Sequence, residues 1–153
     1  MALPVLNFPE VNLRFQKNVK GTLQVFDFIR KKFVDASPEE YVRQALLNYL
    51  VTHKNYSPST LSVEKQLLLN GTKKRYDAVV YDSTLKPLLL IECKAPNIRL
   101  SQSAINQTMR YNLILNVPYL LITNGLEHVC IHHSNNQFNQ LNDIPFFQDL
   151  GNL

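Results

Sequence analysis

The pattern of apolar and polar positions predicts a series of short strands interrupted by two helices. Turn signals such as Asn70-Gly71 and Asn124-Gly125 separate several of the strands. By length and composition, strands are expected over residues 61–69, 76–81, 88–94, 118–123 and 127–133. Strand-like stretches also cover residues 15–19 and 22–34, with Gly21 between them as a turn. Residues 136–153 are expected to form one last strand or a tail.

Each predicted helix has a recognisable start. Ser37 is a suitable N-cap, Pro38 fits the first helical position, and Glu40 lies three residues after the cap. A helix is expected from there to about His53, and Ser101 is expected to cap a second one over residues 102–116. The buried stripe of the first helix is predicted to contain Val42, Leu46, Tyr49 and Leu50.

The order of these elements is a helix, three strands, a helix and two strands. Three consecutive strands can form a meander, but a fourth parallel strand needs a helical crossover. The expected fold class is therefore α/β, a mixed sheet flanked by helices with extra N-terminal strands. We expect an arm and first strand in residues 1–21, the main domain in residues 22–135, and a C-terminal strand or tail in residues 136–153.

Candidate chemistry lies near the ends of two neighbouring strands. If residues 76–81 and 88–94 form a simple hairpin with Tyr81 opposite Leu88, then Asp77 faces Glu92. Side chains alternate along a strand, so Lys94 shares the face of Glu92. Two carboxylates and an ammonium are thus predicted to converge.

Carboxylates directly opposite each other destabilise a sheet, and removal from water makes the conflict worse. A bound cation would resolve it, and Mg²⁺ takes one or two carboxylates and also binds phosphate oxygens. The alternative interpretation is a surface Glu92–Lys94 pair with Asp77 as a lone exposed acid.

The spacing from Asp77 to the Glu92-Cys93-Lys94 triplet resembles the PD-(D/E)xK nuclease superfamily, although Tyr76, not proline, precedes the Asp. More of the chain, roughly residues 22–133, resembles a narrower group, the N-terminal nuclease domain of type I restriction enzyme R subunits. That likeness rests on Phe26-Asp27, Ile29-Arg30-Lys31-Lys32, Ser37-Pro38-Glu39-Glu40-Tyr41-Val42-Arg43-Gln44, Lys74-Arg75-Tyr76-Asp77, Ile91-Glu92-Cys93-Lys94-Ala95-Pro96, Gln107-Thr108-Met109-Arg110-Tyr111-Asn112 and Thr123-Asn124-Gly125.

The resemblance implies a restriction-endonuclease-like αβββαβ core and a set of catalytic roles. Asp77 and Glu92 would hold Mg²⁺ or Mn²⁺, and Lys94 would orient the attacking water. Many relatives add an acid from the first helix, and Glu39 and Glu40 are both candidates. Glu39 lies nearer the predicted stripe, and both acids could simply stabilise the helix N-terminus.

Two further sets of residues are candidates for supporting roles. Gln107 and Tyr111 share a helix face, and this spacing recurs beside the active site of related nucleases. The alternative is an ordinary core tyrosine and a solvated glutamine. Candidates for contact with nucleic acid are Arg30, Lys31, Lys32, Arg43 and Gln44, with a solvated strand edge as the alternative for the first three.

Composition narrows the function classes. The 153 residues, 45% of them apolar, suit one domain with a real core. No run of 18 apolar residues and no signal peptide is apparent, and two cysteines are too few for a disulfide framework, so a cytoplasmic location without membrane contact is expected. His128, Cys130 and His132 are spread over about 13 Å of strand, too far for one zinc ion.

The leading hypothesis is a Mg²⁺-dependent DNA endonuclease of the restriction type, with restriction-modification subunits as possible partners. No Gly-rich phosphate loop is present, so these residues do not predict an ATP-driven translocase. The net charge of +4 permits a polyanionic partner without requiring one. The alternatives are a catalytically silent binding module with the nuclease fold and a structural subunit.

Overall fold

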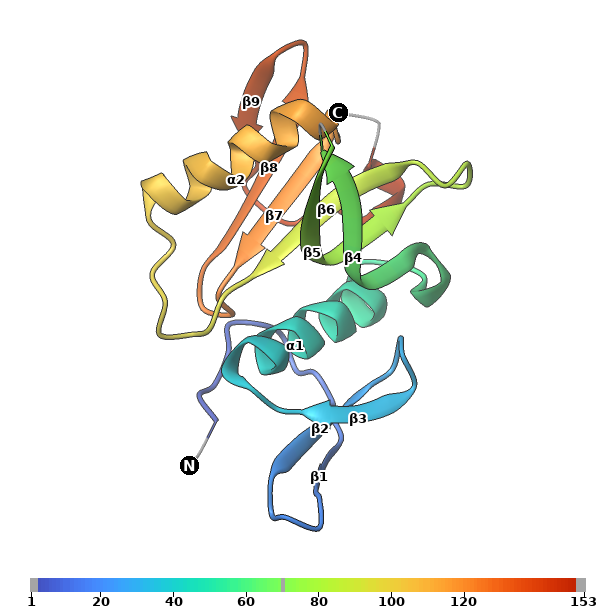
Figure 1. Ribbon diagram of the computed structural model, residues 1–153, viewed down its shortest axis with the longest axis vertical. Helices are drawn as coiled ribbons and strands as arrows, with labels where there is room; N and C mark the ends of the chain where they lie inside the picture. The colour runs from blue at the N-terminus through green and yellow to red at the C-terminus, as the bar shows by residue number, and fades with distance from the viewer. Residues whose placement is uncertain (1–2, 70, 151–153) are drawn as a thin grey trace.

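The computed structural model describes residues 3–69 and 71–150, and Figure 1 shows two sheets and two long helices in this part. The helices are α1 (Pro38–His53) and α2 (Gln102–Leu115), with short 3-10 turns η1 (Pro58–Thr60) and η2 (Phe147–Asp149). The strands are β1 (Phe15–Lys17), β2 (Leu23–Asp27), β3 (Lys32–Asp35), β4 (Leu61–Leu69), β5 (Thr72–Tyr81), β6 (Pro87–Cys93), β7 (Tyr119–Thr123), β8 (His128–Ser134) and β9 (Gln137–Gln140).

The larger sheet has the order β4-β5-β6-β7-β8-β9, and the smaller one has the order β1-β2-β3. Only the β6–β7 pair is parallel among the described ladders, and α2 makes the crossover between those two strands. The expected α/β class, with a mixed sheet, flanking helices and extra N-terminal strands, is confirmed.

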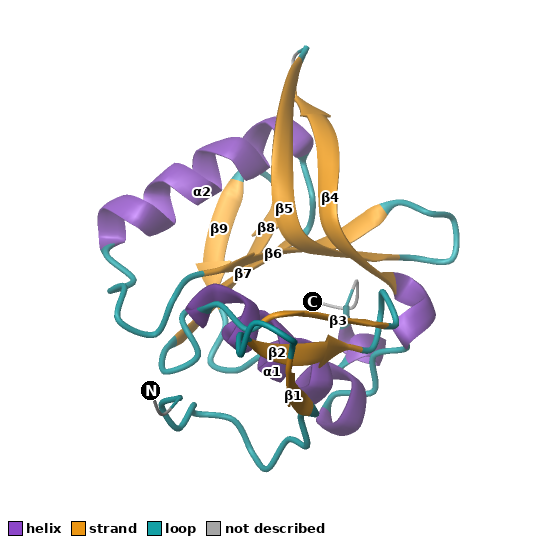
Figure 2. Cartoon of the chain, turned by 60° about the horizontal axis from the view of Figure 1, so that its bottom comes forward, coloured by secondary structure: helices purple, strands orange, loops and turns teal. Residues whose placement is uncertain are grey.

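Helix α1 lies between the two sheets, as the views in Figures 1 and 2 agree. Its N-cap is the predicted one, because the Ser37 hydroxyl accepts a hydrogen bond of 3.1 Å from the backbone N–H of Glu40. Val42, Leu46 and Leu50 are buried as expected, and Tyr49 is partly buried. With a sheet on either side, the helix buries more than one stripe.

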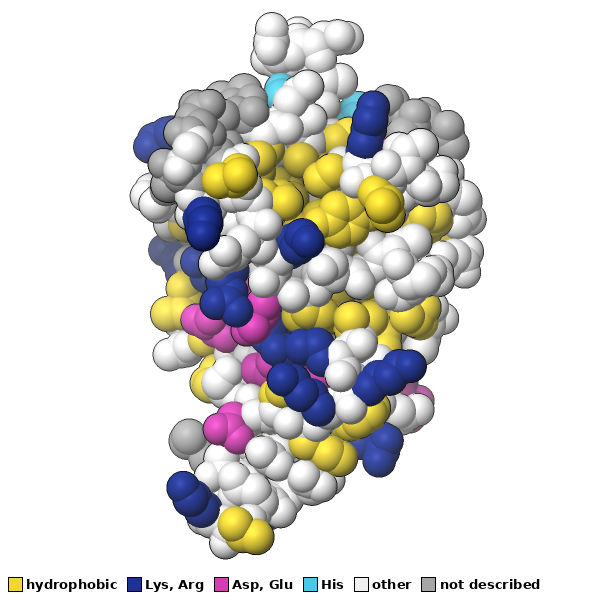
Figure 3. Space-filling view, turned by 45° about the vertical axis from the view of Figure 1, so that its right-hand side comes forward, with side chains coloured by type: hydrophobic (Ala, Val, Ile, Leu, Met, Phe, Trp, Pro, Cys, Tyr) yellow, Lys and Arg dark blue, Asp and Glu magenta, His cyan; other side chains and the backbone are white. Residues whose placement is uncertain are grey.

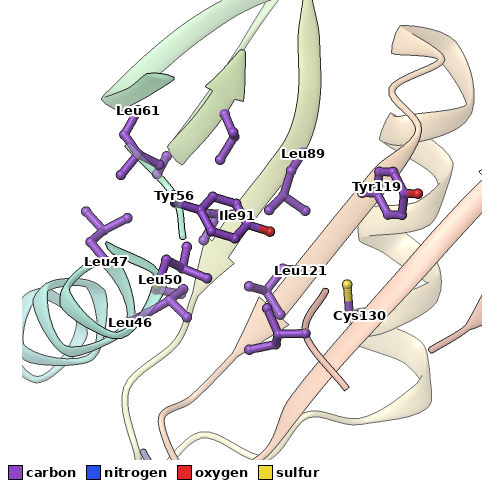
Figure 4. Packing of buried hydrophobic residues seen from close by; sticks show 14 of the residues in the cluster. Leu46, Leu47, Leu50, Tyr56, Leu61, Leu89, Ile91, Tyr119, Leu121 and Cys130 are labelled. Carbon is purple, nitrogen blue, oxygen red and sulfur yellow. The ribbon is translucent and has the colours of Figure 1, made fainter. Parts of the chain in front are cut away.

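The core of the larger sheet has two layers that follow from strand alternation. Figure 4 shows the layer on the α1 side, where Leu46 and Leu50 meet Leu89, Ile91 and Leu121. The opposite layer covers the α2 side and is formed by Tyr76, Val79, Leu90, Leu100, Val117, Leu120, Ile122 and Ile131. Residues that alternate along β6 therefore face different helices, which fixes where the end of that strand presents its polar side chains.

The predicted hairpin of motif strands is correct in its middle and wrong at its turn. Val79 pairs with Leu90 as expected, but Tyr81 pairs with Pro87 and not with Leu88. The ladder shifts there because Asp82 closes a tight loop, its Oδ1 accepting hydrogen bonds from the backbone N–H groups of Thr84 and Lys86 at 2.8 and 3.0 Å. The shift lies at the far end of the hairpin from Asp77, so it does not move the candidate site.

The strand-like stretch expected over residues 22–34 contains strands but is not continuous. The segment forms β2 and β3 with a turn between them. The Asp27 carboxylate accepts hydrogen bonds of 2.9 Å from the backbone N–H groups of both Ile29 and Arg30, and Lys31 adopts a left-handed φ of 57°. An Asx-type turn therefore interrupts the stretch. Arg30 and Lys31 lie in this turn, and Lys32 begins β3, which is an edge strand of the smaller sheet.

Other expectations hold at the level of elements. Ser101 caps α2 through the backbone N–H of Ala104, and β7, β8 and a last strand, β9, follow. Asn70 of the predicted Asn70-Gly71 turn lies outside the described residues. Within residues 3–69 and 71–150, no helix is long and apolar enough to cross a membrane.

The N-terminal arm packs on the β7–β8 turn, and Gly125 is where the two meet. Asn7 donates its backbone N–H to the Gly125 carbonyl at 2.7 Å, and a Cβ on Gly125 would lie 2.8 Å from Leu6 Cδ2 and 3.2 Å from Val42 Cγ2. Gly21 has a similar positive φ of 81°, but its missing Cβ would meet nothing within 4 Å.

We expect Gly125→Ala to lower the free energy of unfolding by more than Gly21→Ala does. Both substitutions place a side chain at positive φ, at a cost of roughly 1–2 kcal/mol, and only Gly125→Ala adds a steric clash. Urea unfolding of the two variants measures the difference. Equal losses would show that the arm does not pack on this turn.

Candidate active site

The candidate site lies where the larger sheet splits. Strand β5 pairs with β6 only as far as Ala78↔Ile91, whereas β6 continues beside β7 to Cys93↔Thr123. Beyond this point β5 pairs with β4 alone, out to Leu69↔Thr72, and the two strands form a ribbon. Asp77 is the first residue of β5 beyond the split.

The Asp77 side chain bridges the gap between the diverging strands. Its Oδ2 accepts a hydrogen bond of 2.7 Å from the backbone N–H of Cys93, and its Oδ1 lies 3.7 Å from Nη1 of Arg43. Burial raises the pKa of the Asp77 carboxyl, the Cys93 N–H and Arg43 oppose that rise, and the negative charge of Glu39 adds to it. The Asp77 carboxyl is therefore held in position by its contacts, although its surroundings disfavour a negative charge.

Glu92 is buried more deeply, with 8% of the residue exposed. It lies two residues after Leu90, which belongs to the α2-side layer, so alternation directs it to that side. Its Oε1 has no hydrogen-bond partner among the described residues, and Nζ of Lys74 lies 3.7 Å from it. That separation is too long for a hydrogen bond, so the contact is an ion pair.

The two carboxyl groups influence each other. Burial raises the pKa of Glu92, the Asp77 charge raises it further, and the ammonium groups of Lys74 and Lys94 lower it. Lys94 acts on the pKa of Asp77 in the same direction, after the larger effects of burial, the Cys93 N–H, Arg43 and Glu39. The structure therefore brings the predicted acid-acid-lysine group within electrostatic range of one another.

Cys93 lies between Glu92 and Lys94 in sequence, but it contributes to this group only through its backbone N–H and not through its thiol. It is buried in the α1-side layer, and burial raises the pKa of its thiol well above the usual range. An un-ionised thiol is a poor nucleophile. Cys93 is therefore a small buried residue of the core.

The first helix supplies two acids with different surroundings. Glu40 is buried and accepts two hydrogen bonds from Arg43, at 2.6 and 2.7 Å, and one from Arg30 at 2.8 Å. Glu39 is exposed, but its charge acts on Asp77. Glu40 is the buried one of the two because the smaller sheet covers its side of α1, and which of the two acids serves the site stays a prediction.

The candidate residues for nucleic-acid contact differ in exposure and in their partners. Arg30 lies among the carboxylates of Asp27, Glu40 and Glu64, whereas Lys31 and Lys32 are exposed. Arg43 is buried in its ion pairs, which hold its pKa above the usual range against the effect of burial. Gln44 is fully buried, and its amide has no hydrogen-bond partner among the described residues.

Gln107 and Tyr111 both lie in α2, on the side of the sheet to which Glu92 is directed. Gln107 is exposed. The side chain of Tyr111 lies outside the described part of the structure. Their supporting role stays a prediction.

Sequence reasoning missed two residues beside the acids. Lys74 pairs with Glu92. The sequence showed it only as part of the Lys74-Arg75-Tyr76-Asp77 motif and did not predict this contact. Glu64 contacts Arg30, Arg43 and Arg75 and has a left-handed φ of 52° opposite Asp77, where the β4–β5 ladder skips a pair. Such strained backbone is held only where surrounding contacts over-determine it, and it clusters at functional sites.

The residues fit a divalent cation held by two carboxylates. Among the described side chains, no group of three or more His, Cys, Asp and Glu residues is placed to hold a metal ion. Mg²⁺ does not require such a group, because it keeps several waters and uses one or two carboxylates with substrate phosphates. Two acids with raised pKa values match that need: Glu92 is buried and has an oxygen without a hydrogen-bond partner in the described part of the chain, and Asp77 is partly buried.

Fold and site together define an α/β domain with a mixed sheet and an acidic group at a strand split. The sequence profile of the type I restriction enzyme R protein N terminus matches residues 38–145, most of the chain. The chain therefore belongs to this family. No curated protein matches it.

Two solved structures are similar to the chain. A fragment of a putative HsdR subunit of a type I restriction enzyme from Vibrio vulnificus YJ016 is 19% identical over 65% of this chain and 21% of that one, with a TM-score of 0.50. A DrdV–DNA complex is 13% identical over 70% of this chain and 11% of that one, with a TM-score of 0.41. The chain thus spans about a fifth or less of these proteins, and the first likeness supports the fold.

We expect Asp77→Asn/Glu92→Gln to be more stable than the wild type at neutral pH without metal. Raised pKa values mean that the native state binds these protons more tightly than the unfolded state, so wild-type stability falls as pH rises above the ordinary values of 3.8 and 4.5. The variant avoids this loss, and below pH 3.8 the difference should vanish.

Urea unfolding from acid to neutral pH, in the presence of a chelator, measures this difference. Asp82→Asn is the matched control with the opposite sign, because hydrogen bonds, first of all from the Lys86 backbone, lower the pKa of the Asp82 carboxyl. A double variant whose stability difference does not change with pH would contradict the electrostatic picture of the site.

Proposed function

We propose that the chain is a metal-dependent endodeoxyribonuclease domain with a restriction-endonuclease-like αβββαβ core. The proposal is supported by the mutual electrostatic influence of Asp77, Glu92 and Lys94 near the sheet split, in a chain of the R protein N-terminal family. Membership of the family supports a nuclease domain, and the raised pKa values of the two acids support a bound cation.

In this proposal Asp77 and Glu92 hold Mg²⁺ or Mn²⁺. When bound, the ion supplies charge neutralisation at the phosphate and an activated water. Lys94 orients the attacking water, a role that suits the three N–H donors of an ammonium group. The Cys93 N–H holds one oxygen of Asp77, and Nη1 of Arg43 lies 3.7 Å from the other oxygen. Both contacts orient the carboxylate.

Glu39 is the proposed helix acid of the site. Its charge acts on Asp77, whereas Glu40 is occupied by two arginines. Glu40 and Arg43 would then be positioning residues, because they act on the site through Asp77. Gln107 and Tyr111 keep their proposed supporting roles on the α2 side.

DNA is the proposed substrate, and the β4–β5 ribbon is its proposed contact surface. The ribbon begins at Asp77 and carries the exposed side chains of Lys65, Lys73 and Arg75. A two-stranded ribbon fits the major groove of B-DNA. On the face shown in Figure 3, Lys and Arg side chains surround a small group of acids, as an enzyme acting on a polyanion requires.

A second candidate is a catalytically silent binding module. It is favoured by the arginine and lysine that already neutralise the acids, Arg43 at Asp77 and Lys74 at Glu92. Other restriction subunits are possible partners in either case. A cytoplasmic location is proposed as well, and the two free, buried cysteines support it.

Cleavage of plasmid DNA should require Mg²⁺ or Mn²⁺ and should be abolished by a chelator. Lys94→Ala leaves both proposed metal ligands in place, so DNA affinity in Ca²⁺ should change little while cleavage falls by about 10²-fold or more. Gel assays of binding and cleavage measure both. Undiminished cleavage by Lys94→Ala would remove the assignment, and binding without cleavage in any metal would favour the binding module.

Neutralising the ribbon should reduce the salt dependence of DNA binding. Each phosphate contact contributes about 0.9 to the slope of log affinity against log salt, so Lys65→Gln/Lys73→Gln should lower the slope by roughly 2. Lys17→Gln/Lys20→Gln is the matched control, because both lysines are exposed on the β1–β2 hairpin of the other sheet. A larger effect from the control pair would place DNA on the smaller sheet.

A further inference from the structure

Lys74 is a basic residue of β5 that pairs with Glu92, one of the two proposed metal ligands. It lies in β5 three residues before Asp77, and its Nζ is 3.7 Å from Oε1 of Glu92. The lysine side chain is 30% exposed, whereas that of Glu92 is 11% exposed. One end of this ion pair is therefore buried, and the other reaches solvent.

The pair has the character of a temporary contact. A buried carboxylate requires a compensating positive charge. The Lys74 ammonium supplies that charge from 3.7 Å, a distance longer than that of a direct hydrogen bond. Because the carboxylate needs a positive charge but the lysine end of the pair reaches solvent, another cation that binds Glu92 can take the place of the ammonium.

A divalent ion at Glu92 would be such a competitor. Two positive charges cannot share one carboxylate oxygen at close range without strong repulsion. Binding of the ion must therefore move the ammonium away from Oε1. The partial exposure of Lys74 shows where it can go, because the side chain already lies at the surface of the ribbon.

We propose that Lys74 is a displaceable counter-ion, which neutralises Glu92 before metal binds and contacts a DNA phosphate afterwards. The inference rests on the proposed function and assigns a residue to it. Three strand positions place Lys74 about 10 Å along β5 from Asp77, so its long side chain serves a phosphate that flanks the one attacked. Metal binding thus prepares the ribbon for DNA.

The test compares metal binding and DNA binding, for which Lys74→Met should have effects of opposite sign. Methionine keeps an apolar stem of similar length and removes the charge. Without DNA, calorimetry should show Mn²⁺ affinity raised by about 3- to 10-fold, because no ammonium competes for Glu92. In Ca²⁺, DNA affinity should fall, and the salt slope should drop by about 1.

Two variants control for other causes. Lys74→Arg keeps the charge, so its Mn²⁺ affinity should stay within about twofold of the wild type. Lys73→Met removes a charge from the exposed neighbour that lies on the opposite face of β5, and it should leave Mn²⁺ affinity unchanged. Thermal unfolding without metal confirms that every variant is folded before binding is measured.

The outcomes separate this inference from the function on which it rests. A wild type that binds no Mn²⁺ would overturn the metal site itself. A wild type that binds Mn²⁺ while Lys74→Met binds it equally or more weakly would overturn only the role of Lys74, which would then be a fixed structural contact. The same conclusion would follow if Lys74→Arg raised Mn²⁺ affinity as much as Lys74→Met.

Discussion

The hydrogen bond from the Cys93 N–H to the Asp77 carboxylate is the contact on which the site depends. Where β5 leaves β6, the strands can no longer pair backbone to backbone, and a buried N–H without an acceptor would cost about 1–3 kcal/mol. Asp77 supplies the missing acceptor. The same bond holds the Asp77 carboxylate at the backbone of Cys93, between Glu92 and Lys94 in sequence and within electrostatic range of both.

The acids are placed at an electrostatic cost, and neighbouring cations offset it. Burial raises the pKa of both Asp77 and Glu92, and each carboxylate has a positive side chain within 4 Å, Arg43 from α1 and Lys74 from the ribbon. The two cations differ in burial. Arg43 is locked by Glu40, whereas Lys74 reaches solvent, so one side of the site is rigid and the other can rearrange.

The smaller sheet gives α1 a second buried face, and this decides which charges are structural. Its β2–β3 turn brings Arg30 to Glu40 and Glu64, and Glu40 in turn holds Arg43. A helix with only one sheet beside it would leave these side chains in solvent. The N-terminal strands are therefore part of the support of Asp77, although they lie far from it in sequence.

The sequence by itself determined the elements whose signals are local. The caps at Ser37 and Ser101, the alternation along β4 and the Val79↔Leu90 register all follow from neighbouring residues, and they suffice to bring Asp77 and Glu92 to one end of two strands. Only the tertiary structure decided that Glu40 is buried and pairs with Arg30, that β2 and β3 are separate strands, and that Lys74 pairs with Glu92. These outcomes depend on contacts between segments that are distant in the chain. The periodicity of one segment carries no information about such contacts.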